Sequence, residues 1–164
     1  MTLSIKHASN ADSDALWHIL EPIIRAGETY PLPRDMSRDD ALAYWLSQSH
    51  QTFTATSEGS VVGTYYIRPN NSGGGAHVAN CGYMVGENAR GKGVARAMCA
   101  HSIEVARQSG FKAIQFNFVI ATNTRAVALW ISCGFETLCT LPQVFDHPRE
   151  GLVDALVMFK QLEF

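Results

Sequence analysis

A short segment at residues 90–95, Arg-Gly-Lys-Gly-Val-Ala, places glycines and basic side chains immediately before an amphipathic helix. Glycine lets the backbone turn sharply and approach a ligand closely. The first N–H groups of a helix have no intrahelical partner, and they lie at the positive end of the helix dipole. Arg90, Lys92 and Arg96 add full positive charges around this turn. The segment therefore predicts a site for phosphate or pyrophosphate, and with it a phosphorylated cofactor.

Three phosphate-binding patterns fit parts of this turn. A Walker-type loop, G-x-x-x-x-G-K-[ST], matches as far as its lysine, but Gly93 replaces the hydroxyl that would hold magnesium. A dinucleotide fingerprint needs a third glycine where Arg96 stands, and residues 111–120 offer no acid for a ribose. The third pattern, [QR]-x-x-G-x-[GA], is filled completely by Arg90, Gly93 and Ala95. On this turn alone, an ordinary helix start with solvated basic residues stays open.

A second segment, residues 123–135, has the features of a capped amphipathic helix. Asn123 or Thr124 can cap its start, and Gly134 suits its C-terminal end. Apolar residues recur between them at helical spacing. The segment also fits the pattern N-x-x-A-x-x-L-[YW]-x-x-x-G-F. A capped helix explains this segment by itself, but it does not explain the pairing with the turn upstream.

Together and in this order, the two segments resemble the coenzyme A turn and the second motif of the GNAT N-acetyltransferases. The resemblance extends over nearly the whole chain and implies a single GNAT domain over residues 1–164, with acetyl-CoA as co-substrate. The implied fold is α/β (α+β), with one central, mostly antiparallel mixed sheet of about seven strands that contains a splayed pair and is flanked by about four helices. The implied reaction is transfer of an acetyl group to an amine.

The resemblance also implies roles around the acetyl thioester. In the family, the strand before the turn splays from its neighbour, and one of its backbone N–H groups polarises the thioester carbonyl. By position this role falls to Met84 or Val85, while Asn123 would hold the pantetheine arm or a water. The expected cofactor-binding residues are Met84, Val85, Arg90, Gly91, Lys92, Gly93, Val94, Ala95, Arg96 and Asn123.

The groups that move protons are less apparent. An amine acetyltransferase needs a neutral amine and a proton for the departing thiolate. Many relatives use a tyrosine of the second motif as the acid, but here the position is Trp130, whose indole does not ionise usefully. Glu28 is the best acidic candidate for a base, with a solvated loop charge as the alternative. We expect direct transfer, with Glu28, Asn117 and the Met84 backbone as the catalytic candidates.

Polar and aromatic residues in apolar settings mark the acceptor side. Asn117 lies between two phenylalanines, so on a strand its amide would point opposite to both. If it faces the splayed cleft, it would bind the carboxylate or the amine of the acceptor; the alternative is a hydrogen bond that satisfies the sheet edge. Tyr30, Tyr83 and Phe145 are expected to wall this pocket, with core packing as the alternative.

A weaker resemblance bears on the acceptor. Residues 27–30, Asn117 and residues 141–154 resemble fungal acetyltransferases that act on azetidine-2-carboxylate, and the overall layout resembles that of phosphinothricin-type acetyltransferases. Both imply a small amino acid or a toxic analogue as the acceptor. Two alternatives stay open: a non-catalytic acyl-CoA sensor, which Trp130 would suit, and transfer to a peptide or protein amine.

The bulk composition is that of one soluble domain. The chain has 164 residues, of which 46% are hydrophobic and 17% charged, so it can bury a core without disulfides or metals. A net charge of −2 argues against a nucleic-acid or membrane partner. No signal-peptide pattern or membrane-length apolar run is present, so we expect a cytoplasmic protein. The cysteines are expected to be reduced and no metal is expected, while family habit favours a homodimer.

The elements that must position these residues follow from periodicity. Strands are expected at residues 3–8, 52–56, 61–68, 77–85, 113–119, 136–141 and 153–162. Helices are expected from Asp12 to Ala26, from Ser37 onward, from the glycine turn to Gly110, and over residues 124–133. Pro22 should kink or shorten the first helix. A glycine-rich loop at residues 70–75 and a Pro/Gly-rich segment at residues 142–151 complete an order that is typical of GNAT folds.

Overall fold

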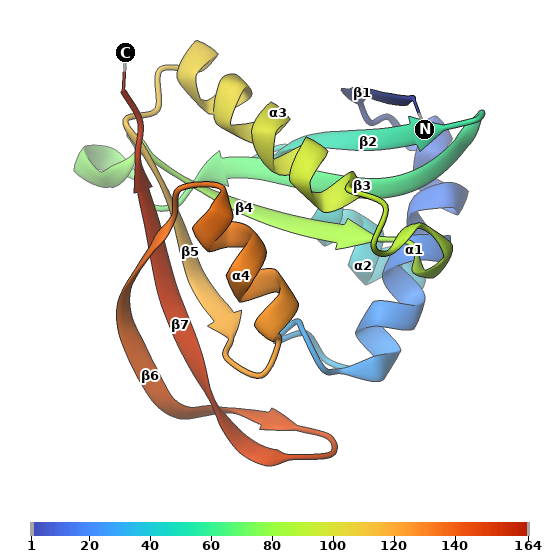
Figure 1. Ribbon diagram of the computed structural model, residues 1–164. Coiled ribbons are helices and arrows are strands. Elements are labelled where there is room, and N and C mark those ends of the chain that lie inside the picture. Colours follow the sequence, from blue (N-terminus) through green and yellow to red (C-terminus); the bar gives the residue numbers. More distant parts are fainter. Residues whose placement is uncertain (1, 164) are drawn as a thin grey trace.

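The computed structural model describes residues 2–163 and shows one mixed seven-stranded sheet in the order β1-β2-β3-β4-β5-β7-β6 (Figure 1). The sheet and the four helices confirm the expected fold class. The elements are β1 (Leu3–His7), α1 (Ser13–Ala26), α2 (Arg38–Trp45), β2 (Gln51–Ser57), β3 (Ser60–Pro69), β4 (Val78–Val85), α3 (Val94–Gln108), β5 (Ala113–Ile120), α4 (Thr124–Ser132), β6 (Glu136–His147) and β7 (Gly151–Gln161).

The middle of the sheet is splayed. β4 and β5 are parallel neighbours, but they pair only at Val78–Ala113 and Ala79–Ile114. Beyond these two positions the strands diverge, although β4 continues to Val85 and β5 to Ile120. The expected splayed pair is therefore present, and it leaves the inner edges of both strands without a strand partner over most of their length.

Helices cover both faces of the sheet, and the alternation of strand side chains sends neighbours to opposite faces. Tyr65 packs with Met98 of α3 and Trp130 of α4 in one buried cluster. Tyr66, the next residue, packs with Leu16 of α1 and Trp45 of α2 in the other. β3 and β4 are thus fixed from both sides, which makes them a rigid platform for a site.

The last hairpin is longer than its sequence pattern predicts. β6 runs to His147 and β7 begins at Gly151, whereas the expected strands were separated by residues 142–151. Pro142 lies within β6 because β6 is an edge strand, where a missing N–H removes no ladder bond on the solvent side. The register shifts between Leu141 and Phe145, and Gln143 has a φ of 51°. An irregular but continuous strand therefore replaces the expected loop.

The first helix ends at Ala26 as expected, and Pro22 does not shorten it. α1 continues through Pro22, and the φ of 64° at Gly27 allows the left-handed cap. All four cysteines are free, as expected. None of the helices within residues 2–163 is both long enough and apolar enough to span a bilayer.

Candidate active site

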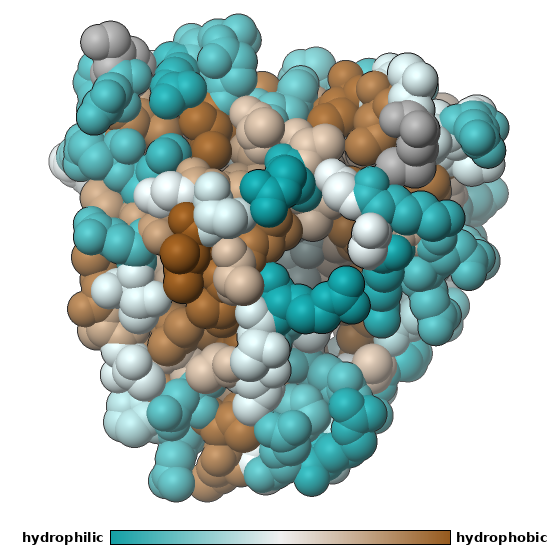
Figure 2. Space-filling model, in the orientation of Figure 1, coloured by the Kyte–Doolittle hydropathy of each residue, from teal (hydrophilic) through white to brown (hydrophobic). Residues whose placement is uncertain are grey.

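A cleft of about 880 Å³ opens where β4 and β5 diverge. Its walls come from the loop after α1, the end of β3, the free edges of β4 and β5, the turn before α3, and the start of α4. Figure 2 shows this face of the molecule hollowed near its centre, with hydrophilic residues around the hollow. The two motifs that the sequence singles out therefore meet at one cavity.

The glycine turn forms one end of the cleft. Gly93 is the N-cap of α3 with a φ of 79°, and no side chain caps this helix. The first helical bond runs from the Ala97 N–H to the Gly93 carbonyl at 3.0 Å, so the amides of the preceding turn remain available. Gly91 also has a positive φ, 74°. Uncapped amides at a helix N-terminus fit the pyrophosphate of coenzyme A.

Basic side chains surround this turn unequally. Arg90 and Arg96 line the cleft, and the Arg96 guanidinium donates to the Ser132 Oγ at 3.0 Å, which connects α3 to α4. Lys92 is exposed and lies outside the cleft lining. Arg125, on the first turn of α4, lines the cleft beside Gly91 and was not predicted. The sequence did contain an indication of this role. A cation in the first turn of a helix interacts unfavourably with the helix dipole unless an anion binds there.

The backbone of β4 alternates between β3 and the cleft. The Gly86 N–H donates to the Val62 carbonyl at 2.9 Å on the β3 side, and the His77 carbonyl accepts from the Lys112 N–H at 2.8 Å on the β5 side. Alternation between these points directs the Val85 amide toward the cleft and the Met84 amide toward β3. Of the two expected oxyanion donors, the geometry favours Val85. The Met84 side chain is buried beneath α1 and α2.

Tyr83 and Tyr30 meet at this edge. The Tyr30 hydroxyl donates to the Tyr83 carbonyl at 2.8 Å, so the Tyr83 peptide group also faces the cleft. The Tyr83 phenol points the other way, into the core, where it bonds with the Ser102 Oγ at 2.6 Å. Burial raises the pKa of both phenols well above 10, so both stay neutral. Tyr30 reaches the cleft with its side chain, as expected, whereas Tyr83 contributes mainly backbone.

The second motif lies along the opposite wall. The Asn123 Oδ1 caps α4 by accepting from the Ala126 N–H at 3.4 Å, and Asn123 lines the cleft. Trp130 is buried against Tyr83 and Phe116, with ring centroids 4.9 and 5.1 Å apart. The indole therefore closes the cleft floor as a packed aromatic, without supplying a proton.

Asn117 occupies an irregular position on β5. The β5–β7 register shifts between Phe116 and Val119, so Asn117 lies in a bulge. Its Nδ2 donates to the Asn70 Oδ1 at 2.7 Å, and its Oδ1 accepts from the Gln115 Nε2 at 3.0 Å. The side chain is exposed and lines the cleft. The amide is hydrogen-bonded within the protein, as the structural alternative expects, and it also borders the cavity; binding of the acceptor by Asn117 stays a prediction.

The expected aromatic wall needs one correction. Phe145 is buried on β6 and packs against Phe118, with ring centroids 6.2 Å apart, but it does not line the cleft. The longer β6 explains this, because Phe145 belongs to the edge strand of the sheet, beyond β7 from β5, and not to a loop over the pocket. Tyr44 and Tyr66 were not predicted, and they form the wall instead, with their hydroxyls 2.9 Å apart. The Tyr66 ring fits because Gly82 has no Cβ, which would lie 2.7 Å from a ring carbon.

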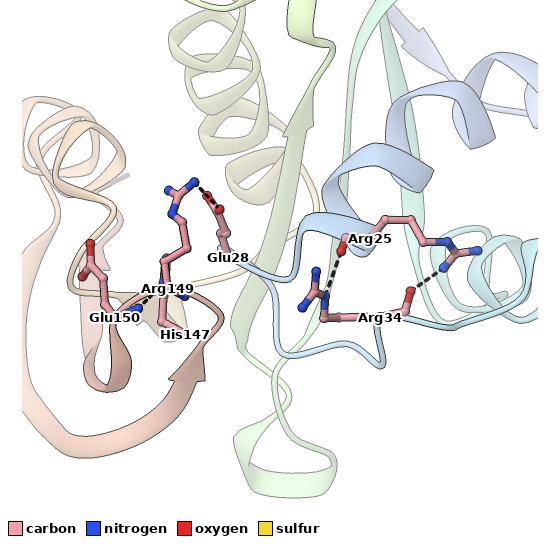
Figure 3. A network of polar contacts seen from close by, with 6 residues as sticks. All are labelled: Arg25, Glu28, Arg34, His147, Arg149 and Glu150. Atoms are coloured by element: carbon pink, nitrogen blue, oxygen red, sulfur yellow. Dashed lines mark hydrogen bonds and ion pairs between the residues drawn. The ribbon is translucent and has the colours of Figure 1, made fainter.

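Glu28 lies at the rim of the cleft in an ion pair. Its Oε1 is 3.0 Å from the Arg149 Nη1, which joins the loop after α1 to the turn between β6 and β7 (Figure 3). The Glu28 side chain is 31% exposed and that of Arg149 is 72% exposed. The loop is braced by Arg25 and Arg34, each of which donates to the other's carbonyl, at 2.6 and 2.8 Å. Glu28 is thus a positioned carboxylate.

Three proteins are similar to this chain, two of them in structure and one in sequence. A GCN5-related N-acetyltransferase from Kribbella flavida is 41% identical, with 98% of each chain covered and a TM-score of 0.94. The N-acetyltransferase aca1 of Schizosaccharomyces pombe is 30% identical over an alignment of 151 residues, and the match covers 82% of this chain and 72% of that protein. The putative acetyltransferase yncA of Salmonella typhimurium, solved with acetyl-CoA, is 22% identical with a TM-score of 0.86 over 100% and 96% of the chains; it supports the fold alone.

The sequence profile of the acetyltransferase (GNAT) family matches residues 15–135, which include both motifs and both walls of the cleft. The match agrees with the uncapped turn at α3 and with the splay between β4 and β5. The chain therefore belongs to the GNAT acetyltransferase family, as an acyltransferase that takes its acetyl group from acetyl-CoA.

Proposed function

We propose that this enzyme acetylates the amine of a small molecule, an amino acid or a toxic analogue of one, by direct transfer. The main support for this proposal is the shape of the cleft. One end of the cleft is an uncapped, basic helix N-terminus, and the other end is a wall of tyrosines and asparagines. Such a cavity can hold a phosphorylated donor and a small polar acceptor side by side. The aca1 relative, named only as an N-acetyltransferase, is compatible with this acceptor class.

The donor would be bound by the turn and by β4. The amides after Gly93, with Arg90 and Arg125, would hold the pyrophosphate. The Val85 amide would donate to the thioester carbonyl oxygen, where negative charge develops during attack. Acetyl-CoA supplies the activated acyl group, and the protein fixes its orientation by backbone groups that need no reorganisation.

The acceptor amine must lose a proton and the sulfur must gain one. The amine nitrogen forms its bond to the acetyl carbon while the carbon–sulfur bond breaks, and one proton passes from nitrogen to the solvent or to a base. Glu28 is our candidate for that base, acting through water from the rim of the cleft. Since Trp130 cannot donate usefully, the thiolate would take its proton from water or from the product ammonium.

Thiol release from acetyl-CoA tests this proposal directly. The panel comprises the free amino acids, azetidine-2-carboxylate, phosphinothricin, simple amines and peptides with free N-termini. Saturable release with a free amino acid or analogue, together with an acetylated product found by mass spectrometry, is the expected result. Acetylation confined to peptides or proteins would contradict the small-molecule acceptor and leave the enzyme class unchanged.

Assembly and location stay predictions. The expected homodimer is supported by the exposed apolar residues Leu138, Val144 and Leu152 on the last hairpin, since such side chains often mark an interface. Light scattering on the purified chain measures the oligomeric state, and fractionation of cells tests the cytoplasmic location.

A further inference from the structure

Arg68, the penultimate residue of β3, is a half-buried cation in the wall of the cleft. Its Nε is fully buried, and within residues 2–163 it has no hydrogen-bond partner. No carboxylate in that part of the chain forms an ion pair with it. A buried guanidinium normally has a partner, because its desolvation is costly when it is unpaired.

The neighbours of Arg68 are neutral. Its guanidinium lies over the Tyr66 ring, 5.9 Å from the centroid, and burial keeps the Tyr66 phenol neutral by raising its pKa. His50 stacks on the same tyrosine, with ring centroids 4.3 Å apart. Burial, helped by the charge of Arg68, lowers the pKa of His50, so this ring is also neutral near pH 7. A ring face offsets part of the guanidinium charge, but it leaves the planar N–H fork free to bind an anion.

Arg68 lies at the end of the cleft opposite the glycine turn. It is directly across from Asn80 on β4, and Asn80 lies about 17 Å along that strand from Val85, at about 3.4 Å per residue. The phosphates of the donor would sit on the turn beyond Val85, so they cannot satisfy Arg68. The anion that pairs with this side chain must therefore arrive with the acceptor.

A second hollow leads from the surface to the same side chain. This shallow depression of about 630 Å³ is bordered by Arg68, Ser49 and residues 69–73. Arg68 lines both this hollow and the main cleft. The guanidinium therefore stands where an acceptor could approach from the side opposite acetyl-CoA.

We propose that Arg68 binds the carboxylate of the acceptor and thereby selects amines that carry an acid group. The inference rests on the proposed function and narrows it, because a peptide N-terminus presents a neutral amide where a free amino acid presents a carboxylate. Guanidinium and carboxylate form two parallel N–H···O bonds, which fix orientation as well as charge. The amine of the bound amino acid is then held at a set distance from the acetyl carbon.

The test compares acid and neutral acceptors in matched variants. For the best amino acid of the panel and its carboxamide, kcat/KM is measured in wild type, Arg68→Gln and Arg68→Lys. We expect Arg68→Gln to lower kcat/KM for the acid by roughly 10- to 100-fold, mainly through KM, and to leave the carboxamide within about twofold. The acid-to-carboxamide ratio of kcat/KM is compared between each variant and wild type. The different amine basicities of the two acceptors affect every protein equally, so they cancel in this comparison. Arg68→Lys should retain part of the preference, and KM for acetyl-CoA should not change.

Controls separate this role from a structural one. Arg107→Gln removes an exposed arginine of α3, and it should leave the acid-to-amide ratio unchanged. Because the charge of Arg68 is unpaired, Arg68→Gln should not lower the melting temperature. Equal losses for both acceptors, no loss for either, or a large fall in melting temperature would each overturn the proposal.

A second measurement needs no acceptor turnover. Sodium acetate, compared with sodium chloride at equal ionic strength, should raise the melting temperature of wild type more than that of Arg68→Gln. Equal shifts in the two proteins would overturn the anion site. If the panel yields no acetylated small molecule while this difference persists, the proposed function fails and the anion site at Arg68 stands.

Discussion

The two ends of the cleft are built by different means. At the donor end, the turn at residues 90–96 presents successive backbone amides at the start of one helix, and its glycines take positive φ angles. At the acceptor end, Tyr30, Tyr66, Arg68 and Asn117 present side chains from three separate segments, the loop after α1, β3 and β5. The donor end is thus local in sequence and uses the backbone. The acceptor end is assembled only by folding.

This difference has a physical reason. A pyrophosphate needs several convergent N–H groups, and any sequence that starts a helix with glycines can supply them. An acceptor needs a particular arrangement of charge and apolar surface, which side chains supply. The donor end should therefore be sensitive to backbone changes and tolerant of side-chain changes, while the acceptor end should show the opposite.

The largest expected effect is at the donor end. Gly93→Val should weaken acetyl-CoA binding by roughly 100-fold, about 2.7 kcal/mol, because a branched Cβ intrudes on the approach of the ligand to the backbone. Apart from the chain neighbours of Gly93, no atom of residues 2–163 lies within 4 Å of that Cβ, so the expected clash is with the ligand. Calorimetric titration measures the affinity.

Backbone strain in this variant has a matched control. Gly110 has a φ of 83°, close to the 79° of Gly93, and it too has open space around a Cβ. Gly110→Val should lose a similar stability, about 1–2 kcal/mol, with normal affinity for acetyl-CoA. Equal affinity of the two variants for acetyl-CoA would show that the turn at Gly93 does not bind the donor.

The next effect concerns proton transfer at the rim. Glu28→Gln should lower kcat by roughly 100-fold if the carboxylate takes the proton of the amine through water. Arg149→Gln breaks the same ion pair from the other side, and it should change kcat by no more than about threefold, because exposed pairs contribute little. Steady-state rates at saturating acetyl-CoA measure kcat for both variants and distinguish a base from a residue that only anchors the loop. Similar small changes in both variants would show that Glu28 only anchors the loop.

A smaller effect is expected at Asn117. Asn117→Ala should raise the acceptor KM by roughly 10-fold and leave the affinity for acetyl-CoA unchanged, as the loss of one or two hydrogen bonds would predict. Gln115→Ala removes a bond that orients the Asn117 amide, so its effect on KM should be weaker. If Asn117→Ala changes only the melting temperature, Asn117 serves the structure through Asn70.

The smallest effect is a pH dependence of stability that arises from His50 at the acceptor end. Burial lowers the pKa of His50, which faces Tyr44, Tyr66 and Arg68, below its ordinary value of 6.5. As the pH falls through 6.5, the unfolded chain takes up this proton before the folded one, so the free energy of unfolding falls and is regained at higher pH. His50→Asn should flatten the fall in melting temperature between neutral and mildly acidic pH. An unchanged slope of melting temperature against pH in this variant would contradict the role of His50.

The donor end could be predicted from the sequence because its residues lie in short continuous segments. Gly93 and Asn123 were found from spacing, and the structure places both on the cleft. The sequence alone could not show whether the amide of Met84 or that of Val85 faces the cleft, because the direction of an amide depends on strand pairing. Arg125 was overlooked although a cation in a first helical turn is itself a signal for an anion.

The acceptor end was predicted in part, for equally specific reasons. Tyr30 and Asn117 were identified from their polar groups in apolar settings, and both line the cleft. Phe145 was misplaced, because the pattern treated the bulged part of β6 as a loop. Arg68 gave no local signal. That its buried Nε finds no hydrogen-bond partner within residues 2–163 is a property of the folded molecule, and only the assembled environment reveals it.

The splay between β4 and β5 gives this protein a sheet edge in its interior. Exposed edges usually risk pairing with another molecule's strand, whereas here the walls of the cleft shield the edge from such contacts. An extended chain with its own amides, such as pantetheine, can hydrogen-bond there much as a strand would. We therefore expect the amides along β4 to fall into two alternating classes in hydrogen exchange. Those in the ladder with β3 should exchange slowly with solvent, and those of Tyr83 and Val85 should exchange faster until a bound substrate pairs with them.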